Sequence, residues 1–92
     1  MTIRTNSRTW KNSASYFVSI FASKEGSFIA AKLILICSDR AMKFVINDFL
    51  ERTKTSDETI IEVPYSKEQG VTTPNKAIQK AIELFKNEIK SN

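Results

Sequence analysis

The sequence contains no histidine, one cysteine, two glycines and two prolines among its 92 residues. Without histidine, the chain lacks the usual general base of hydrolases and the commonest metal ligand. Two isolated glycines, Gly26 and Gly70, leave no glycine-rich loop that could cradle a phosphate. The single cysteine, Cys37, cannot form an internal disulfide, and at the end of an apolar segment it is typical of a buried core residue. These absences favour a protein that acts by binding, without catalysis and without a cofactor.

Long apolar runs are also missing. The longest, over residues 28–37, contains Lys32 and is half the length of about 20 residues that a membrane-spanning helix needs. The first fifteen residues have no apolar stretch resembling a signal peptide. We therefore expect an intracellular protein with no membrane segment.

Composition and length indicate one small globular unit. Hydrophobic residues make up 41% of the chain and charged residues 26%, the balance of an ordinary folded protein. No internal repeat or linker divides the sequence. We expect a single domain over residues 1–92, with a basic N-terminal arm over 1–14 that forms an extension or a short edge strand, and a core over 15–92.

A β-hairpin is the first element expected in the core. Segments 16–23 (YFVSIFAS) and 28–37 (FIAAKLILIC) are rich in β-branched and aromatic residues. Lys24, Glu25 and Gly26 separate them, and Gly26 stands where a three-residue hairpin loop needs a left-handed backbone. The pattern predicts two antiparallel strands.

Two helices are expected further along the chain. Apolar residues at spacings of three and four follow the helix-start residue Asp39 and predict a first helix over 39–53. Thr73 and Pro74 open a second helix that runs to about residue 90. The apolar positions that predict the helices are Met42, Val45, Ile46, Phe49 and Leu50 for the first, and Ile78, Ala81, Ile82, Phe85 and Ile89 for the second.

A third strand is expected over 58–65 (ETIIEVPY), at a sheet edge because Pro64 cannot donate to a neighbouring strand. The order is then strand, strand, helix, strand, helix. A crossover through the first helix lets the third strand lie antiparallel beside the first, with both helices on the same face of the sheet. The predicted fold is an α+β, two-layer sandwich.

Such a sandwich would leave one apolar sheet face without a helix. Both sides of the hairpin are apolar, with Tyr16, Val18 and Ile20 on one and Phe17 and Phe21 on the other. A large exposed apolar patch is uncommon in monomers. Three groups could cover this face of the sheet: the N-terminal arm with Trp10, a second copy in a homodimer, or a foreign partner.

Positive charge is concentrated in the first half of the chain. Residues 1–46 carry a net charge of +5 and residues 47–92 a net charge of −1. Basic groups interleaved with an aromatic ring suit a polyanion such as nucleic acid, although they also serve solubility. The candidate nucleic-acid-binding or partner-binding residues are Arg4, Arg8, Trp10, Lys11, Lys24, Lys32 and Arg40.

Carboxylates offer a weaker hypothesis. The pairs Asp57–Glu58 and Asp48–Glu51 could contribute to a magnesium site. They fall in segments expected to be solvated loops and helix faces, whereas nuclease sites draw several acids from different strands. No metal site is therefore predicted.

The hairpin YFVSIFAS-KEG-SFIAAKLILIC, the strand ETIIEVPY and the closing helix PNKAIQKAIELFKNEIK, preceded by a short basic arm, form a layout that resembles the small phage-encoded anti-CRISPR proteins, in particular inhibitors of type I-F surveillance complexes. The resemblance covers the whole chain in size and format and rests on no diagnostic motif. It implies a non-enzymatic inhibitor that binds protein, with or without guide RNA, in a multi-subunit RNA-guided complex. Such an inhibitor blocks the binding of target DNA in the cytoplasm of a bacterial host. The alternative from the residues is a small basic protein that binds nucleic acid on its own.

Overall fold

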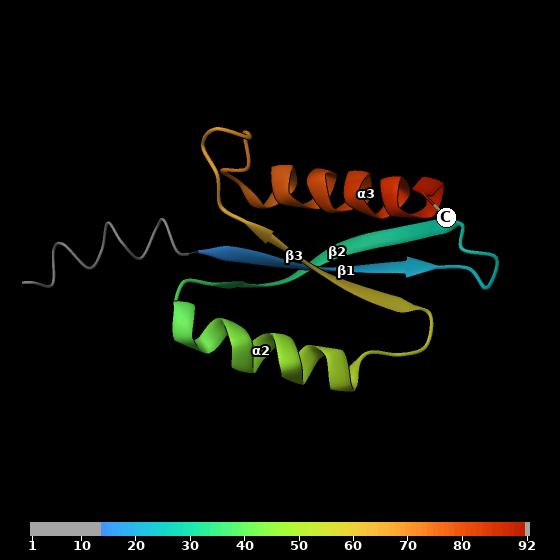
Figure 1. The fold of residues 1–92 in the computed structure, drawn as a ribbon, viewed down its shortest axis with the longest axis horizontal. Helices are drawn as coiled ribbons and strands as arrows, with labels where there is room; N and C mark the ends of the chain where they lie inside the picture. Colours follow the sequence, from blue (N-terminus) through green and yellow to red (C-terminus); the bar gives the residue numbers. More distant parts are fainter. Residues whose placement is uncertain (1–13, 92) are drawn as a thin grey trace, which may run out of the picture.

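A three-stranded antiparallel sheet and two helices form the described part of the chain, residues 14–91 with side chains to Glu88, in the computed structural model (Figure 1). Along the chain the elements are β1 Ser15–Ala22, β2 Phe28–Cys37, α2 Arg40–Thr53, β3 Glu58–Pro64 and α3 Pro74–Ser91. The strand order is β2-β1-β3, with β1 antiparallel to both neighbours. The predicted α+β class, the sheet and the element order are confirmed.

Local turn and cap chemistry accounts for the element boundaries. Gly26 has a φ of 88° in the β1–β2 connection, a conformation that side-chain-bearing residues rarely adopt. Asp39 caps α2, because its Oδ1 accepts a hydrogen bond of 2.9 Å from the Ala41 N–H. Thr73 Oγ1 accepts one of 3.2 Å from the Lys76 N–H at the start of α3. The hairpin turn and the starts of both helices are therefore found at the residues that predict them.

The two helices lie on opposite faces of the sheet, not on the same face as the sequence analysis expected (Figure 1). The cause is β1, the central strand, whose side chains are apolar on both faces. Val18 and Ile20 pack toward α3, whereas Phe17 packs toward α2, and all three are fully buried. Because alternate strand residues point to opposite faces, a central strand of this composition needs cover on both sides. The prediction of an uncovered sheet face is therefore wrong.

The cover on the two faces is unequal. The α3 face holds the larger core, in which Ala77, Ala81 and Phe85 of α3 are buried against the sheet. The α2 face holds a smaller cluster, whose helix side chains, Ile46 and Leu50, are only partly buried. No residue of α2 is fully buried.

The β2 side chains do not alternate as strictly as expected. The β1–β2 register shifts between Phe17 and Val18, so that Leu33 packs with the α3 cluster while Ile34 and Leu35 both pack with the α2 cluster. Such irregularities bend a strand and change the face on which later residues lie. Cys37, at the end of β2, is buried as a core residue, as predicted.

The N-terminal arm falls almost wholly outside the described residues, and so does the proposal that Trp10 closes a sheet face. Its last residue, Ala14, is buried, and its carbonyl oxygen accepts a hydrogen bond of 3.0 Å from the Tyr65 N–H. Within residues 14–91, no helix is both long and apolar enough to cross a membrane.

Candidate protein-binding surface

The structure does not gather the predicted basic residues that it describes into one patch. Lys24 lies in the turn between β1 and β2, Lys32 in the middle of β2, and Arg40 at the start of α2, beyond the other end of that strand. A ten-residue strand is about 33 Å long, so these exposed charges are spread along the molecule. Four other predicted site residues lie outside the described part of the chain: Arg4, Arg8, Trp10 and Lys11.

Lys32 has a local electrostatic role. It lines a groove of about 270 Å³ with Glu58 and Leu50, where the C-terminal half of α2 lies over the sheet. The hydrogen bond from the Ser19 hydroxyl is the largest of the effects that lower the pKa of Glu58. The hydrogen bond from the Thr55 N–H and the positive charge of Lys32 also lower that pKa. The charge of Lys32 therefore acts on Glu58, although the two form no ion pair.

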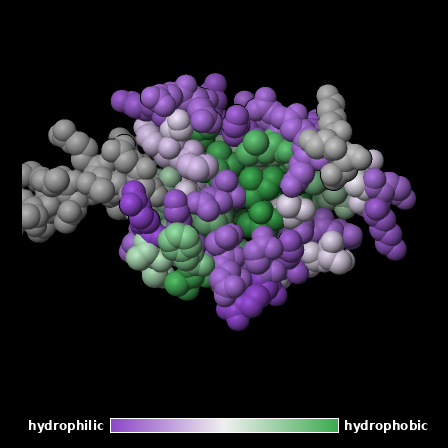
Figure 2. Space-filling view, in the orientation of Figure 1, coloured by the Kyte–Doolittle hydropathy of each residue, from purple (hydrophilic) through white to green (hydrophobic). Residues whose placement is uncertain are grey.

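Exposed apolar side chains gather instead on α2. Met42, Val45 and Phe49 are 46%, 60% and 57% exposed. Their spacing of three and four residues puts them side by side on consecutive turns, and we call these three residues the apolar face of α2. Phe44, which is 73% exposed, lies on another side of the same helix. Figure 2 shows apolar surface over the N-terminal half of α2.

The apolar face of α2 lies beside the residues that hold this helix to the sheet. Ile46 and Leu50, one turn apart, make the apolar contact with the sheet. On the other flank, Lys43 Nζ forms an ion pair of 3.1 Å with Glu62 Oε2 of β3. Turning the apolar face of α2 toward the sheet would carry Lys43 away from Glu62, so the ion pair opposes that rotation.

The sheet surface under α2 is itself partly polar. The Ser15 hydroxyl donates a hydrogen bond of 2.7 Å to Glu62, and the Ser19 hydroxyl donates one to Glu58. Both serines are fully buried on β1, so these bonds satisfy hydroxyls that would be costly to bury alone. This polar layer limits the apolar contact that α2 can make.

The apolar face of α2 was not predicted, because the periodicity of five apolar residues predicts a helix but does not show which of them reach the core. Only Ile46 and Leu50 take part in the core. A signal was present: five apolar positions in fourteen residues, with Phe44 as a sixth, form a wider arc than one helix can bury against a sheet. An apolar arc of this breadth predicts that some of its side chains stay exposed.

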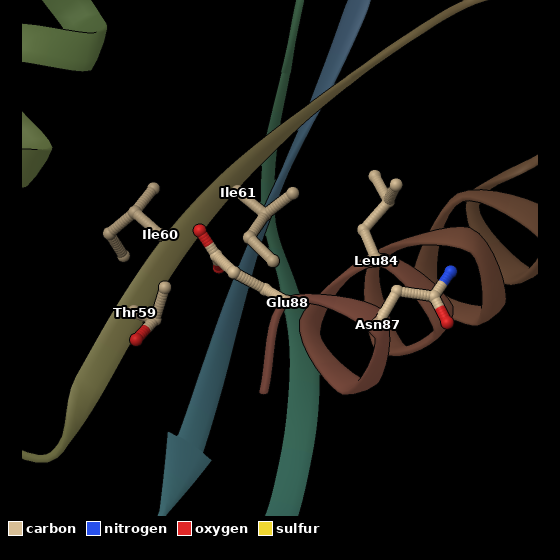
Figure 3. Close-up of a pocket in the computed structure, with 6 residues that line it drawn as sticks. All are labelled: Thr59, Ile60, Ile61, Leu84, Asn87 and Glu88. Carbon is tan, nitrogen blue, oxygen red and sulfur yellow. The ribbon is translucent and has the colours of Figure 1, made fainter. Parts of the chain in front are cut away.

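A second surface feature lies at the outer edge of β3, where α3 overhangs the strand. Ile61 and Leu84 line a groove of about 490 Å³ there, together with Glu88 (Figure 3). Figure 2 shows apolar surface in this region, between α3 and the sheet. Within the described residues, no three His, Cys, Asp or Glu side chains are grouped so that they could hold a metal ion.

These features define a small α+β protein with an antiparallel sheet between two helices and an apolar helix face on its surface. No protein-family model matches the chain, and no curated protein or solved structure shows significant similarity to it.

Proposed function

We propose that this protein acts by binding another protein through the apolar face of α2, without catalysing a reaction. The observation that carries this proposal is the exposure of Met42, Val45 and Phe49 on one side of a helix that has no buried residue. An amphipathic helix with anchors at this spacing is the form that fits a hydrophobic groove of a partner.

The side chains of the apolar face indicate the chemistry of that partner. Met42, Val45 and Phe49 carry no charge, so a partner groove with an apolar floor would complement this surface. Arg40 is exposed and forms no ion pair with the residues that the structure describes. It lies about 200° around the helix from Met42, so it stands outside this contact.

For the identity of the partner, the resemblance to phage-encoded anti-CRISPR proteins supports a type I-F RNA-guided surveillance complex. Binding of α2 to a protein subunit of that complex would hinder the complex from binding target DNA, without any covalent step. The N-terminal basic residues could add contacts to guide RNA. The chain would then act in the cytoplasm of the bacterial host.

The test uses two variants with matched chemistry. Val45→Asp places a charge in the apolar face of α2, whereas Ile29→Asp places one on β2 at a residue that is 63% exposed. We expect the wild-type protein and the Ile29 variant to co-elute with a purified type I-F complex and to reduce its binding of target DNA. Val45→Asp should lose both effects, because burying an unpaired carboxylate in an apolar contact is costly.

Two results would contradict the proposal at different levels. Absence of co-elution and unchanged DNA binding with the wild-type protein would reject the partner. Equal inhibition by Val45→Asp and wild type would reject the surface. Free duplex and single-stranded nucleic acid, included at low salt, should remain unshifted. Binding there with a steep salt dependence would favour the alternative of a nucleic-acid-binding protein.

A further inference from the structure

Among the residues that the structure describes, none pairs with the main-chain groups along the outer edge of β3. β3 is the last strand of the sheet, and its register with β1 is continuous. The Ala22 N–H donates to the Asp57 carbonyl and the Tyr65 N–H to the Ala14 carbonyl, both at 3.0 Å. Odd-numbered residues of this segment therefore direct their main-chain groups toward β1, and even-numbered ones direct theirs outward.

Two residues carry both groups on that outer edge. Ile60 and Glu62 each present an N–H and a C=O away from β1. The Glu58 N–H, by contrast, donates to the Thr55 carbonyl at 3.2 Å, and Pro64 has no N–H. The open edge is therefore short and has defined ends, and it can accept one added strand of a few residues.

The groove described above follows the same edge. Figure 3 shows Ile60 and Ile61 on opposite sides of β3, with Glu88 reaching from α3 toward the strand. A strand added to β3 would lie about 4.8 Å from it, so alternate side chains of that strand would enter the space under α3. There they would meet Ile61 and Leu84, the latter 39% exposed.

The charges around the groove select a basic occupant. Among the residues that line it, Glu88 carries the only charge. On the other side of β3, Glu58 and Glu62 flank Ile60 on the strand itself. Glu62 is already paired with Lys43, so Glu88 is the carboxylate that a lysine or arginine on the groove face of the added strand would meet.

The same charges disfavour a second copy of this chain. Antiparallel pairing of two β3 edges centred on Ile60 would put Glu58 opposite Glu62 of the other copy. Centring on Glu62 would bring the two Glu62 side chains together, and centring on Ile61 would leave them diagonal neighbours. Like charges at these positions destabilise a sheet.

We propose that the groove between β3 and α3 binds an extended segment of a partner protein by strand addition. The segment places an apolar side chain against Ile61 and Leu84, and a lysine or arginine two residues away, on the same face, against Glu88. This mode of recognition takes its affinity from main-chain hydrogen bonds and its selectivity from alternate side chains. The surface is separate from the apolar face of α2, so the two proposals stand or fall independently.

The full-length protein is titrated into a fluorescein-labelled, blocked peptide, Thr-Lys-Thr-Leu-Thr-Lys-Thr, and binding is followed by fluorescence anisotropy. We expect saturable binding. A matched peptide with glutamate in place of lysine should bind at least roughly tenfold more weakly. Leu84→Asp and Glu88→Lys should each lower the affinity for the lysine peptide by a similar factor. Val45→Asp on α2 should leave that affinity unchanged.

Amide hydrogen exchange then tests the geometry. Bound peptide should slow exchange at the Ile60 and Glu62 amides, whose N–H groups become hydrogen-bonded, and leave the exchange of the Ile61 amide unchanged. The proposal is overturned if no peptide binds, if Glu88→Lys has no effect, or if the Ile60 and Glu62 amides stay unprotected. Binding that occurs only after deletion of residues 1–13 would also overturn it, because the groove would then belong to the chain's own N-terminal segment.

Discussion

At the scale of single residues, the polar contacts of Glu58 and Glu62 decide how α2 meets the sheet. Glu62 accepts a hydrogen bond from Ser15 and pairs with Lys43, while Glu58 accepts hydrogen bonds from Ser19 and from the Thr55 N–H. These carboxylates satisfy buried hydroxyls on β1 and reach out to groups on α2 and the turn that follows it. Because Glu58 accepts these hydrogen bonds best when it is ionised, its part of the contact depends on pH.

Glu58 provides a test of that dependence. Its pKa is lowered from the usual value of 4.5, first by the hydrogen bond from Ser19 and then by the one from the Thr55 N–H. A carboxyl group whose pKa is lower in the folded state stabilises the protein above its unfolded-state pKa, and this contribution is lost as the pH falls through the folded-state value. Glu58→Gln should therefore reduce the free energy of unfolding more at pH 7 than at pH 3.

Urea unfolding of both proteins at the two pH values checks this expectation, with Glu83→Gln on α3 as a control. Glu83 pairs with Lys80 at 3.6 Å on the surface, an arrangement that contributes little to stability. A wild-type advantage over Glu58→Gln that is as large at pH 3 as at pH 7 would contradict the linkage.

At the scale of elements, local sequence signals predicted what local chemistry controls. The left-handed Gly26, the cap at Asp39 and the Thr73–Pro74 helix start are each explained by residues close in sequence. The register shift in β2 was not predictable, because it depends on pairing with β1. The side of the sheet on which α2 lies was also missed, since helix periodicity gives the apolar arc but not the partner that faces it.

Because α2 makes few core contacts, its N-cap is important for the stability of the helix. Only Ile46 and Leu50 hold the helix to the apolar core, so the Asp39 cap supports a helix with little tertiary contact. Asp39→Ala should cost about 1 kcal/mol of stability. It should also speed amide hydrogen exchange in α2 more than in the rest of the protein.

Thr73→Ala is the matched variant, because it removes the cap of α3, whose residues Ala77 and Ala81 are fully buried. Tertiary packing should hold α3 in place, so exchange there should change little beyond the first turn. Equal local loosening of the two helices would show that α2 is as firmly packed as α3.

At the scale of the whole molecule, the exposed apolar surface follows from covering both faces of one strand with two helices. The sequence predicts excess apolar surface on an uncovered face of the sheet, in a chain whose first half is basic. With β1 covered on both faces, much of the apolar surface that remains lies on the apolar face of α2 and in the groove between β3 and α3. The predicted basic residues Lys24, Lys32 and Arg40 are spread from the β1–β2 turn to the start of α2. Global packing, which no short-range pattern contains, decides between these outcomes.

If the apolar face of α2 serves binding, it should contribute little to folding. The double variant Met42→Ser, Phe49→Ser removes two side chains that are about half exposed, so its free energy of unfolding should stay within about 1 kcal/mol of the wild type. It should also bind less of a hydrophobic fluorescent dye in the native state, because the dye needs accessible apolar surface. A loss of several kcal/mol, as large-to-small substitutions in a core produce, would instead assign these residues to the core and remove the basis for docking. Chemical unfolding and dye titration on the same samples separate the two outcomes. Truncating core residues lowers the free energy of unfolding, whereas truncating exposed residues lowers dye binding and leaves the free energy of unfolding nearly unchanged.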